Sequence, residues 1–283
     1  MINNVFSNSN KSNASVMSMA AINNVHFPFH LWNAQQKGCT ASGSLSVLIG
    51  HGLGARNPKT KHYWNDGWTN VIAGSAMQCN DSIDTIVSYT ARGHGDSTGW
   101  ETTAEIDLGQ FSWPRLAIDM IEIANSQNIS RFIAAGSSMG AATSLYAAIR
   151  EPTRVVGVIL LRPPTAWESR KERSKYIASS AKKCEQSHPT EKHHFVLRGA
   201  GLTDLPPIDD PVYSQITCPV LILTIEGDET HPISTATQLQ KLISNSILHV
   251  APSDEEAAAH WPALICDFIR RIANTNNDTK DRR

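Results

Sequence analysis

The sequence predicts an α/β protein with a mostly parallel sheet flanked by helices, and two observations lead to this fold class. Short runs of aliphatic and β-branched residues recur along the chain, each bounded by Gly, Pro, Asp or Ser, as is typical of buried strands. Longer segments between them carry apolar residues at helical spacing. Strands that alternate with helices form a mostly parallel sheet covered on both faces.

Six segments are predicted as strands of this sheet: 44–50, 84–90, 131–136, 155–161, 219–224 and 246–250. The clearest helix is predicted at 113–127, where Leu116, Met120 and Ile123 recur at helical spacing. Pro114 suits its first turn. Sheets of this kind place their sites just beyond the carboxyl ends of the strands. The loops that follow the predicted strands are therefore where functional residues are expected.

Length and composition indicate one domain with an insertion. A chain of 283 residues that is 41% hydrophobic can bury one large core. We predict that residues 23–162 and 218–274 form this core domain and that residues 163–217 form the insertion. The two ends are rich in Asn and other polar residues, and disordered tails are predicted at 1–22 and 275–283.

Charge and cysteine content exclude several classes of partner and site. The formal net charge is -1, and no run of Lys and Arg is long enough to follow a phosphate backbone, so no nucleic acid partner is expected. No apolar run approaches the ~18 residues of a membrane span, and the first residues lack the apolar core of a secretory signal. The cysteines are odd in number and form no Cys-x-x-Cys pair, which predicts reduced thiols in a cytoplasmic protein and no zinc site. They are Cys39, Cys79, Cys184, Cys218 and Cys266.

The segment Gly136-Ser137-Ser138-Met139-Gly140 matches the pattern Gly-x-Ser-x-Gly, with Ser138 in the middle. In this pattern a serine occupies a sharp turn from strand to helix, and small neighbours let the two elements pass closely. Ser137 would lie on the flank of the turn, where its hydroxyl bonds to nearby backbone. A glycine-rich turn with two incidental serines is the alternative. The preceding strand and the following helical run favour the nucleophilic turn.

Two further motifs lie in register with this turn. His51-Gly52-Leu53-Gly54 follows the first strand of the predicted core, and Arg92-Gly93-His94-Gly95-Asp96-Ser97 follows the next. With the Gly-x-Ser-x-Gly segment, these motifs make the chain resemble the α/β-hydrolase superfamily over roughly residues 44–273. The resemblance implies that the insertion at 163–217 is the lid that shapes substrate choice.

The resemblance also implies a Ser-His-Asp triad with Ser138 as the nucleophile. The family's carboxylate follows the penultimate strand, and Asp228 stands four residues before Pro232, at the spacing found in similar proteins. Glu226 and Glu229 in the same loop remain rivals for this role.

The family's histidine follows the last strand, and His260 is the predicted base because it precedes an apolar helical run. His249 lies within the strand itself. The resemblance implies an oxyanion hole formed by the backbone amides of Leu53 and Met139, with His51 shaping its turn rather than acting on substrate. Residues that bind the rest of the substrate are not identified by the sequence.

These residues predict a serine hydrolase that cleaves a carboxylic ester of a small molecule through an acyl-enzyme intermediate on Ser138. A serine rather than an aspartate at this position argues against haloalkane dehalogenase and epoxide hydrolase activity. A lactonase, a thioesterase or a hydrolase of carbon-carbon bonds in a diketone are the alternatives within the fold. A non-catalytic ligand receptor is the alternative of another class. No cofactor and no metal ion are expected.

The first part of the insertion, AWESRKERSKYIASSAKKCEQ, has helix-forming composition and an excess of positive charge. Its basic residues are Arg170, Lys171, Arg173, Lys175, Lys182 and Lys183, against Glu168, Glu172 and Glu185. A solvated helix face is the favoured interpretation. The alternative is that the positive charge attracts an anionic substrate.

Overall fold

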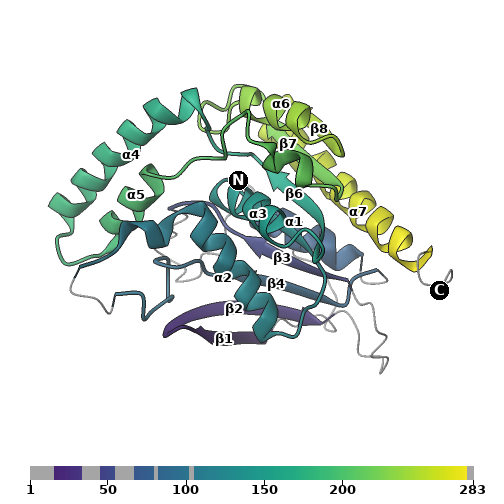
Figure 1. The fold of residues 1–283 in the computed structure, drawn as a ribbon, viewed down its shortest axis with the longest axis horizontal. Coiled ribbons are helices and arrows are strands. Elements are labelled where there is room, and N and C mark those ends of the chain that lie inside the picture. Colours follow the sequence, from purple (N-terminus) through teal and green to yellow (C-terminus); the bar gives the residue numbers. More distant parts are fainter. Residues whose placement is uncertain (1–15, 34–44, 55–66, 80–81, 102–104, 279–283) are drawn as a thin grey trace.

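Residues 16–33, 45–54, 67–79, 82–101 and 105–278 are described in a computed structural model of the chain. They form an eight-stranded sheet with the strand order β1-β2-β4-β3-β5-β6-β7-β8 (Figure 1). The pairs from β4 through to β8 are all parallel, whereas β1 pairs with β2, and β2 with β4, in antiparallel orientation. The predicted fold class is confirmed.

The six predicted strands are all present in this sheet. The strands are β1 Val16–Ile22, β2 Val25–Asn33, β3 Ser46–Gly50, β4 Thr85–Tyr89, β5 Phe132–Ser137, β6 Val155–Leu161, β7 Val220–Ile225 and β8 Ser246–Ala251. The helices are α1 Gly67–Gln78, α2 Trp113–Ser126, α3 Met139–Arg150, α4 Glu168–Ser187, α5 His193–Gly201, α6 Ile233–Leu242 and α7 Asp254–Asp278, with 3₁₀ turns η2 Leu108–Phe111 and η3 Pro211–Gln215. None of the helices in the described ranges combines the length and the apolar character needed to cross a membrane.

The prediction of disordered tails is wrong for residues 16–22 and 275–278, which the structure describes as a strand and a helix end. Residues 16–22 form β1, which pairs with β2 along the edge of the sheet (Figure 1). Asn23 and Asn24 join the two strands with positive φ angles of 49° and 66°, which Asn tolerates in tight hairpin turns. At the other end, α7 continues to Asp278. Residues 1–15 and 279–283 lie outside the described part of the chain.

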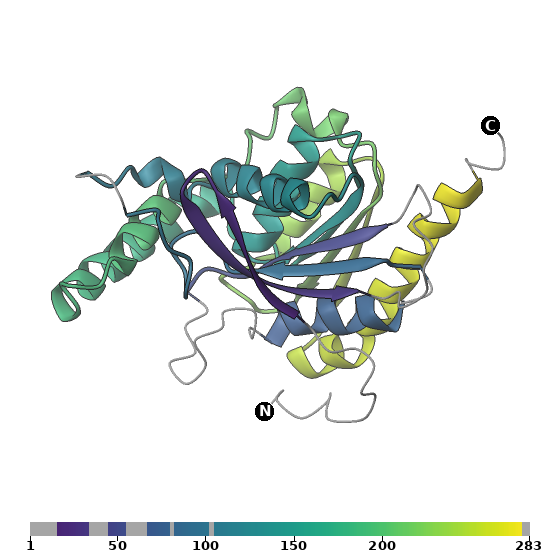
Figure 2. The ribbon, with the colours of Figure 1, turned by 90° about the horizontal axis from the view of Figure 1, so that it is seen from below.

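Both faces of the sheet are buried, and this explains the continuous apolar runs that predicted its strands. Alternate residues of neighbouring strands, such as Leu48 and Ala134, pack with α2, α3 and α6. Their sequence neighbours, such as Ile49 and Ile133, pack with α1 and α7. Figure 2 shows α1 and α7 on one face of the sheet and α2 on the other.

The predicted insertion folds into α4, α5 and η3. α4 and α5 pack against each other and extend beyond the sheet in Figure 1. Gly199 of α5 lies so close to Phe111 and the carbonyl of Leu108 that a Cβ atom there would clash. This close packing on η2 holds the insertion against the core, beside the carboxyl ends of the central strands.

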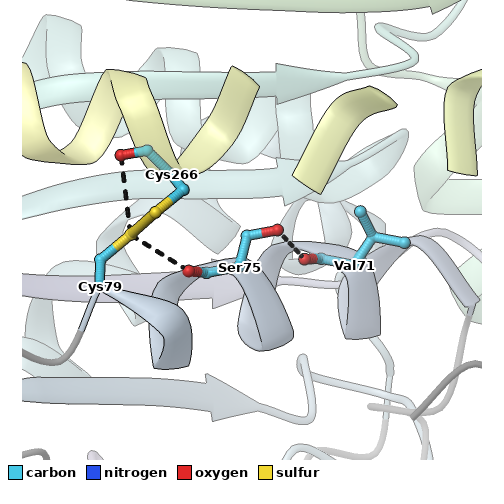
Figure 3. Close-up of a disulfide and its surroundings, with 4 residues drawn as sticks. All are labelled: Val71, Ser75, Cys79 and Cys266. Carbon is cyan, nitrogen blue, oxygen red and sulfur yellow. Dashed lines mark hydrogen bonds between the residues drawn. A yellow bond between two sulfur atoms is a disulfide. The ribbon is translucent and has the colours of Figure 1, made fainter. Parts of the chain in front are cut away.

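Cys79 and Cys266 form a disulfide that joins the end of α1 to α7, with their Cα atoms 6.1 Å apart (Figure 3). The prediction of reduced thiols is therefore wrong for this pair. Cys184 and Cys218 are free, and Cys39 lies outside the described residues. The link crosses 187 positions of sequence and fastens two helices that cover the same face of the sheet.

We expect reduction of this disulfide to lower the free energy of unfolding by about 2–4 kcal/mol, because a cross-link of long range restricts the unfolded chain. Urea unfolding of the protein with and without reductant measures the difference. A Cys184→Ser/Cys218→Ser variant should keep the full response to reductant, whereas a Cys79→Ala/Cys266→Ala variant should lose it. Alkylation of Cys79 and Cys266 in unreduced, denatured protein would contradict the pairing.

Candidate active site

Ser138 occupies a sharp turn between β5 and α3, as the sequence predicts. Its φ and ψ angles are 53° and -112°, a conformation that costs a non-glycine residue ~1–3 kcal/mol. The flanking glycines are required by packing: a Cβ atom at Gly136 would clash with the backbone of Gly140, and one at Gly140 with the backbone of Gly50. The turn thus packs directly on the end of β3, with Ser138 at its tip.

The imidazole beside Ser138 belongs to His231, in the loop between β7 and α6. His231 Nε2 lies 2.9 Å from Ser138 Oγ, and its Nδ1 lies 2.7 Å from Asp228 Oδ2. With Nδ1–H donating to the carboxylate, Nε2 is left unprotonated and can accept the hydroxyl proton of Ser138. The three side chains form one continuous line of hydrogen bonds.

The same carboxylate also fixes the loop that carries the histidine. Asp228 Oδ1 accepts hydrogen bonds from the backbone amides of Thr230 and His231 at 3.0 and 3.2 Å. Glu226 and Glu229, the rivals for the acid position, are both exposed. The structure therefore brings Asp228 to Ser138 through an imidazole, and neither glutamate takes that place.

His260 is not brought to Ser138, which corrects the predicted site. It lies in the second turn of α7 with its side chain 70% exposed, and its Nδ1 bonds the carbonyl oxygen of Glu256 at 3.0 Å. Ala257 and Trp261, one turn apart, face the core, whereas His260 points outward. The signal that the sequence did offer was His231, three residues after the candidate acid and directly before Pro232.

Arg162, which follows β6, is a second side-chain partner of Asp228 and carries a positive charge. Its Nε donates to Asp228 Oδ2 at 2.8 Å, its Nη2 bonds the same oxygen, and its Nη1 lies 3.4 Å from Asp254. Burial by itself would raise the pKa of Asp228. The hydrogen bonds and charges of His231 and Arg162 outweigh burial and hold that pKa well below its usual range. Asp228 therefore stays ionised and orients the imidazole without taking its proton.

A cavity of about 250 Å³ opens over Ser138 and His231. Leu53 and Met139, whose amides are predicted to form the oxyanion hole, both line it. That role stays a prediction; it is favoured by the place of Met139 at the start of α3, where helix amides point outward. The rest of the wall consists of Gly52, Trp68, Trp113, Ser137 and Thr230 and, from the insertion, Pro164, Thr165, Arg170, Arg173 and Ile177.

The other two motifs hold the loops around the site. His51 Nε2 accepts a hydrogen bond from the amide of Ala91 at 2.9 Å, which joins the loops that follow β3 and β4. Arg92 forms a two-pronged ion pair with the buried carboxylate of Asp119 on α2, at 2.7 and 2.9 Å. These residues therefore shape the edge of the sheet from which the site projects. Among the described residues, no group of three or more His, Cys, Asp or Glu side chains could hold a metal ion.

No family model and no curated protein matches the sequence. Solved structures do match the fold. An alpha/beta hydrolase fold protein from Chitinophaga pinensis superposes with a TM-score of 0.63 at 13% identity, over 92% of this chain and 98% of that one. The chain has the α/β-hydrolase fold.

Other proteins of this architecture carry out different reactions. A proline iminopeptidase from Mycobacterium smegmatis superposes with a TM-score of 0.64 at 15% identity, covering 92% of this chain and 99% of its own. A thermophilic esterase from Thermogutta terrifontis gives 0.62 at 16% identity, with 92% and 99% covered. At these identities the comparisons show a shared α/β-hydrolase fold, and the reaction must be inferred from the residues of the site.

We expect His231→Ala to lower kcat/KM for a chromogenic ester about 10⁴-fold or more, because the serine then has no base to take its proton. His260→Ala should change kcat/KM less than about twofold, since solvent-exposed side chains far from a site rarely affect it. Equal melting temperatures for the two variants would show that both fold. A severe loss in His260→Ala with normal activity in His231→Ala would contradict the hydrogen-bonded arrangement.

The lowered pKa of Asp228 predicts a stability that falls on the acid side. The ion pairs of Asp228 contribute fully above its unfolded pKa of ~3.9 and are lost as the pH falls toward the lower folded pKa. Arg162→Met removes one cause of the low pKa, so the pKa of the Asp228 carboxyl should rise toward its usual value in the folded variant. An NMR titration of the side-chain carboxyl carbon of Asp228 in both folded proteins measures it. An unchanged pKa in the variant would exclude a contribution from Arg162.

Proposed function

We propose that this chain is a serine hydrolase that cleaves a carboxylic ester of a small molecule through an acyl-enzyme intermediate on Ser138. The observation that carries the proposal is the hydrogen-bonded line from Asp228 through His231 to Ser138, at the tip of a strained turn and open to a cavity. An isolated serine hydroxyl is a poor nucleophile, and this arrangement supplies the base that it needs.

The first half of the reaction follows from the positions of the three groups. Ser138 Oγ attacks the ester carbonyl carbon while His231 Nε2 takes the hydroxyl proton, and Asp228 stabilises the resulting imidazolium. The carbonyl oxygen becomes an oxyanion that accepts hydrogen bonds from the amides of Leu53 and Met139. The tetrahedral intermediate then collapses, the bond to the alcohol oxygen breaks, and His231 returns its proton to the departing alcohol.

Hydrolysis of the acyl-enzyme repeats the same steps with water as the nucleophile. His231 Nε2 removes a proton from water, the hydroxide attacks the acyl carbon, and the bond to Ser138 Oγ breaks as the serine regains a proton. The products are a carboxylic acid and a free serine. No step requires a cofactor or a metal ion.

The small cavity favours a small substrate over a long-chain ester. Thioester, lactone and carbon-carbon bond cleavage use the same first attack and stay as alternatives. An imidazole held 2.9 Å from a strained serine favours an enzyme over a non-catalytic receptor, which stays the alternative of another class. The cytoplasmic location stays a prediction, and the Cys79–Cys266 disulfide removes one of its supports, because such links persist mainly in oxidising compartments.

A fluorophosphonate probe tests the nucleophile directly. We expect it to label Ser138 and to leave Ser137 unmodified, because Ser138 alone is hydrogen-bonded to the imidazole in the structure. Peptide mass spectrometry locates the adduct, and labelling should be abolished in Ser138→Ala and strongly slowed in His231→Ala. An adduct on Ser137 would refute the nucleophile. Absence of both labelling and ester hydrolysis in the folded wild type would refute the hydrolase.

A further inference from the structure

Two arginines of the insertion line the cavity above Ser138, and none of the described residues that line it is a carboxylate. Arg170 and Arg173 stand three positions apart on α4 and so lie on the same side of the helix. The described part of the chain gives neither of them an ion pair. The cavity wall therefore carries positive charge that no described lining residue balances.

Arg170 is held rigidly in the wall, with its side chain and backbone together 5% exposed. Its Nε donates to the carbonyl of Thr203 at 2.9 Å, and its Nη2 donates to the carbonyl of Ala200. Its guanidinium carbon lies 4.5 Å from the ring centre of Trp113. Carbonyl oxygens fix its orientation but bring no full negative charge.

The charge of Arg170 is balanced only from a distance. Burial lowers its pKa to about 10, which the negative charge of Asp204 partly opposes, so the guanidinium stays protonated at neutral pH. Asp204 itself accepts hydrogen bonds from the backbone amides of Trp167 and Leu205. A buried cation without a direct counter-ion is unfavourable, and an anion placed in the cavity would relieve that cost.

The lysines on the same stretch of α4 differ from these arginines. Lys171 and Lys175 are 70% and 73% exposed and pair with Glu168 and Glu172 at 2.6 and 2.7 Å. Arg173 instead stacks its guanidinium 4.7 Å from the ring centre of Tyr176 and contributes to the cavity wall. In this half of the helix, charge on the solvent face is neutralised, and charge on the cavity face is not.

We propose that this cavity binds a substrate that carries a carboxylate, with Arg173 and Arg170 as the carboxylate-binding residues. The proposal rests on the proposed function and names its substrate class: a small ester whose acyl part ends in a carboxylate. Guanidinium groups match the planar, two-oxygen geometry of that group better than any other side chain. The hydroxyl of Thr165, which is buried without a hydrogen-bond partner among the described residues, lines the same cavity and is an additional donor.

Two esters of nearly equal size test the proposal: 4-nitrophenyl hemisuccinate, which is anionic, and 4-nitrophenyl butyrate, which is neutral. The measured quantity is the ratio of their kcat/KM values. We expect Arg173→Gln to lower the ratio about tenfold or more, the usual consequence of losing a hydrogen bond to a charged group. Lys175→Gln is the matched control, because it removes one positive charge from the same helix outside the cavity, and it should keep the wild-type ratio.

The outcomes separate a local site from attraction at a distance. An equal fall of the ratio in Arg173→Gln and Lys175→Gln, abolished by 0.15 M salt, would overturn the local site in favour of long-range attraction. An unchanged ratio in Arg173→Gln would overturn the proposal outright. Loss of butyrate hydrolysis in Ser138→Ala verifies the proposed function separately, since that ester carries no charge.

A binding measurement keeps the proposal testable without turnover. Monomethyl succinate is titrated into the Ser138→Ala variant, and binding is followed by the fluorescence of Trp68 and Trp113, which line the cavity. We expect saturable binding that weakens about tenfold or more when Arg173→Gln is added and stays unchanged when Lys175→Gln is added. Binding of equal strength in all three proteins would refute the carboxylate site.

Discussion

The carboxylate of Asp228 is the interaction on which the arrangement of the site depends. It receives hydrogen bonds from the imidazole of His231, from the guanidinium of Arg162 and from two amides of its own loop. The first contact orients the imidazole that faces Ser138, and the second holds the side chain of Arg162, which follows β6. The contacts with the two amides fix the backbone of the loop between β7 and α6. A single ionised group thus connects three consecutive parallel strands, β5, β6 and β7, at their carboxyl ends.

This arrangement places Asp228 and His231 in one short loop, and the described segment after β8 contributes no side chain to the hydrogen-bonded line from Asp228 to Ser138. Because the loop is anchored by Asp228 at both Oδ atoms, a separation of three residues is enough to aim the imidazole at Ser138. The beginning of α7 then contributes Asp254, which contacts Arg162 from the far side of the guanidinium. The helix supports the site through Arg162 and through packing, and its His260 remains in solvent.

The sequence predicts those features that depend on local pattern and fails where contacts over long distances decide. Short apolar runs predict the strands β3 to β8, and the spacing of the glycines predicts the turn at Ser138. β1 alternates too weakly to be read as a strand, with Met17 and Met19 exposed, and it becomes a strand because β2 offers an edge for pairing. The Cys79–Cys266 link joins residues that are distant along the chain, so spacing carried no sign of it.

The histidine and the insertion show the same limit at the site. Position relative to the last strand suggested His260, whereas the imidazole that donates a hydrogen bond to Asp228 is that of His231, and the order of residues contains no such geometry. Likewise, the basic residues of the insertion could be counted from the sequence, but the sequence did not tell which of them face solvent and which face the cavity. Only the folded helix separates Lys171 and Lys175, each beside a glutamate in solvent, from the arginines in the cavity wall.

In the proposed reaction, that separation links substrate binding to the chemistry at Ser138. Arg170 and Arg173 line the cavity over Ser138, so the negative charge of an oxyanion formed there would be stabilised by fixed positive charge. Asp228, the one carboxylate in the hydrogen-bonded line, is screened from that cavity by His231 and compensated by Arg162. Positive charge therefore lines the cavity, while the negative charge of Asp228 lies behind the imidazole of His231.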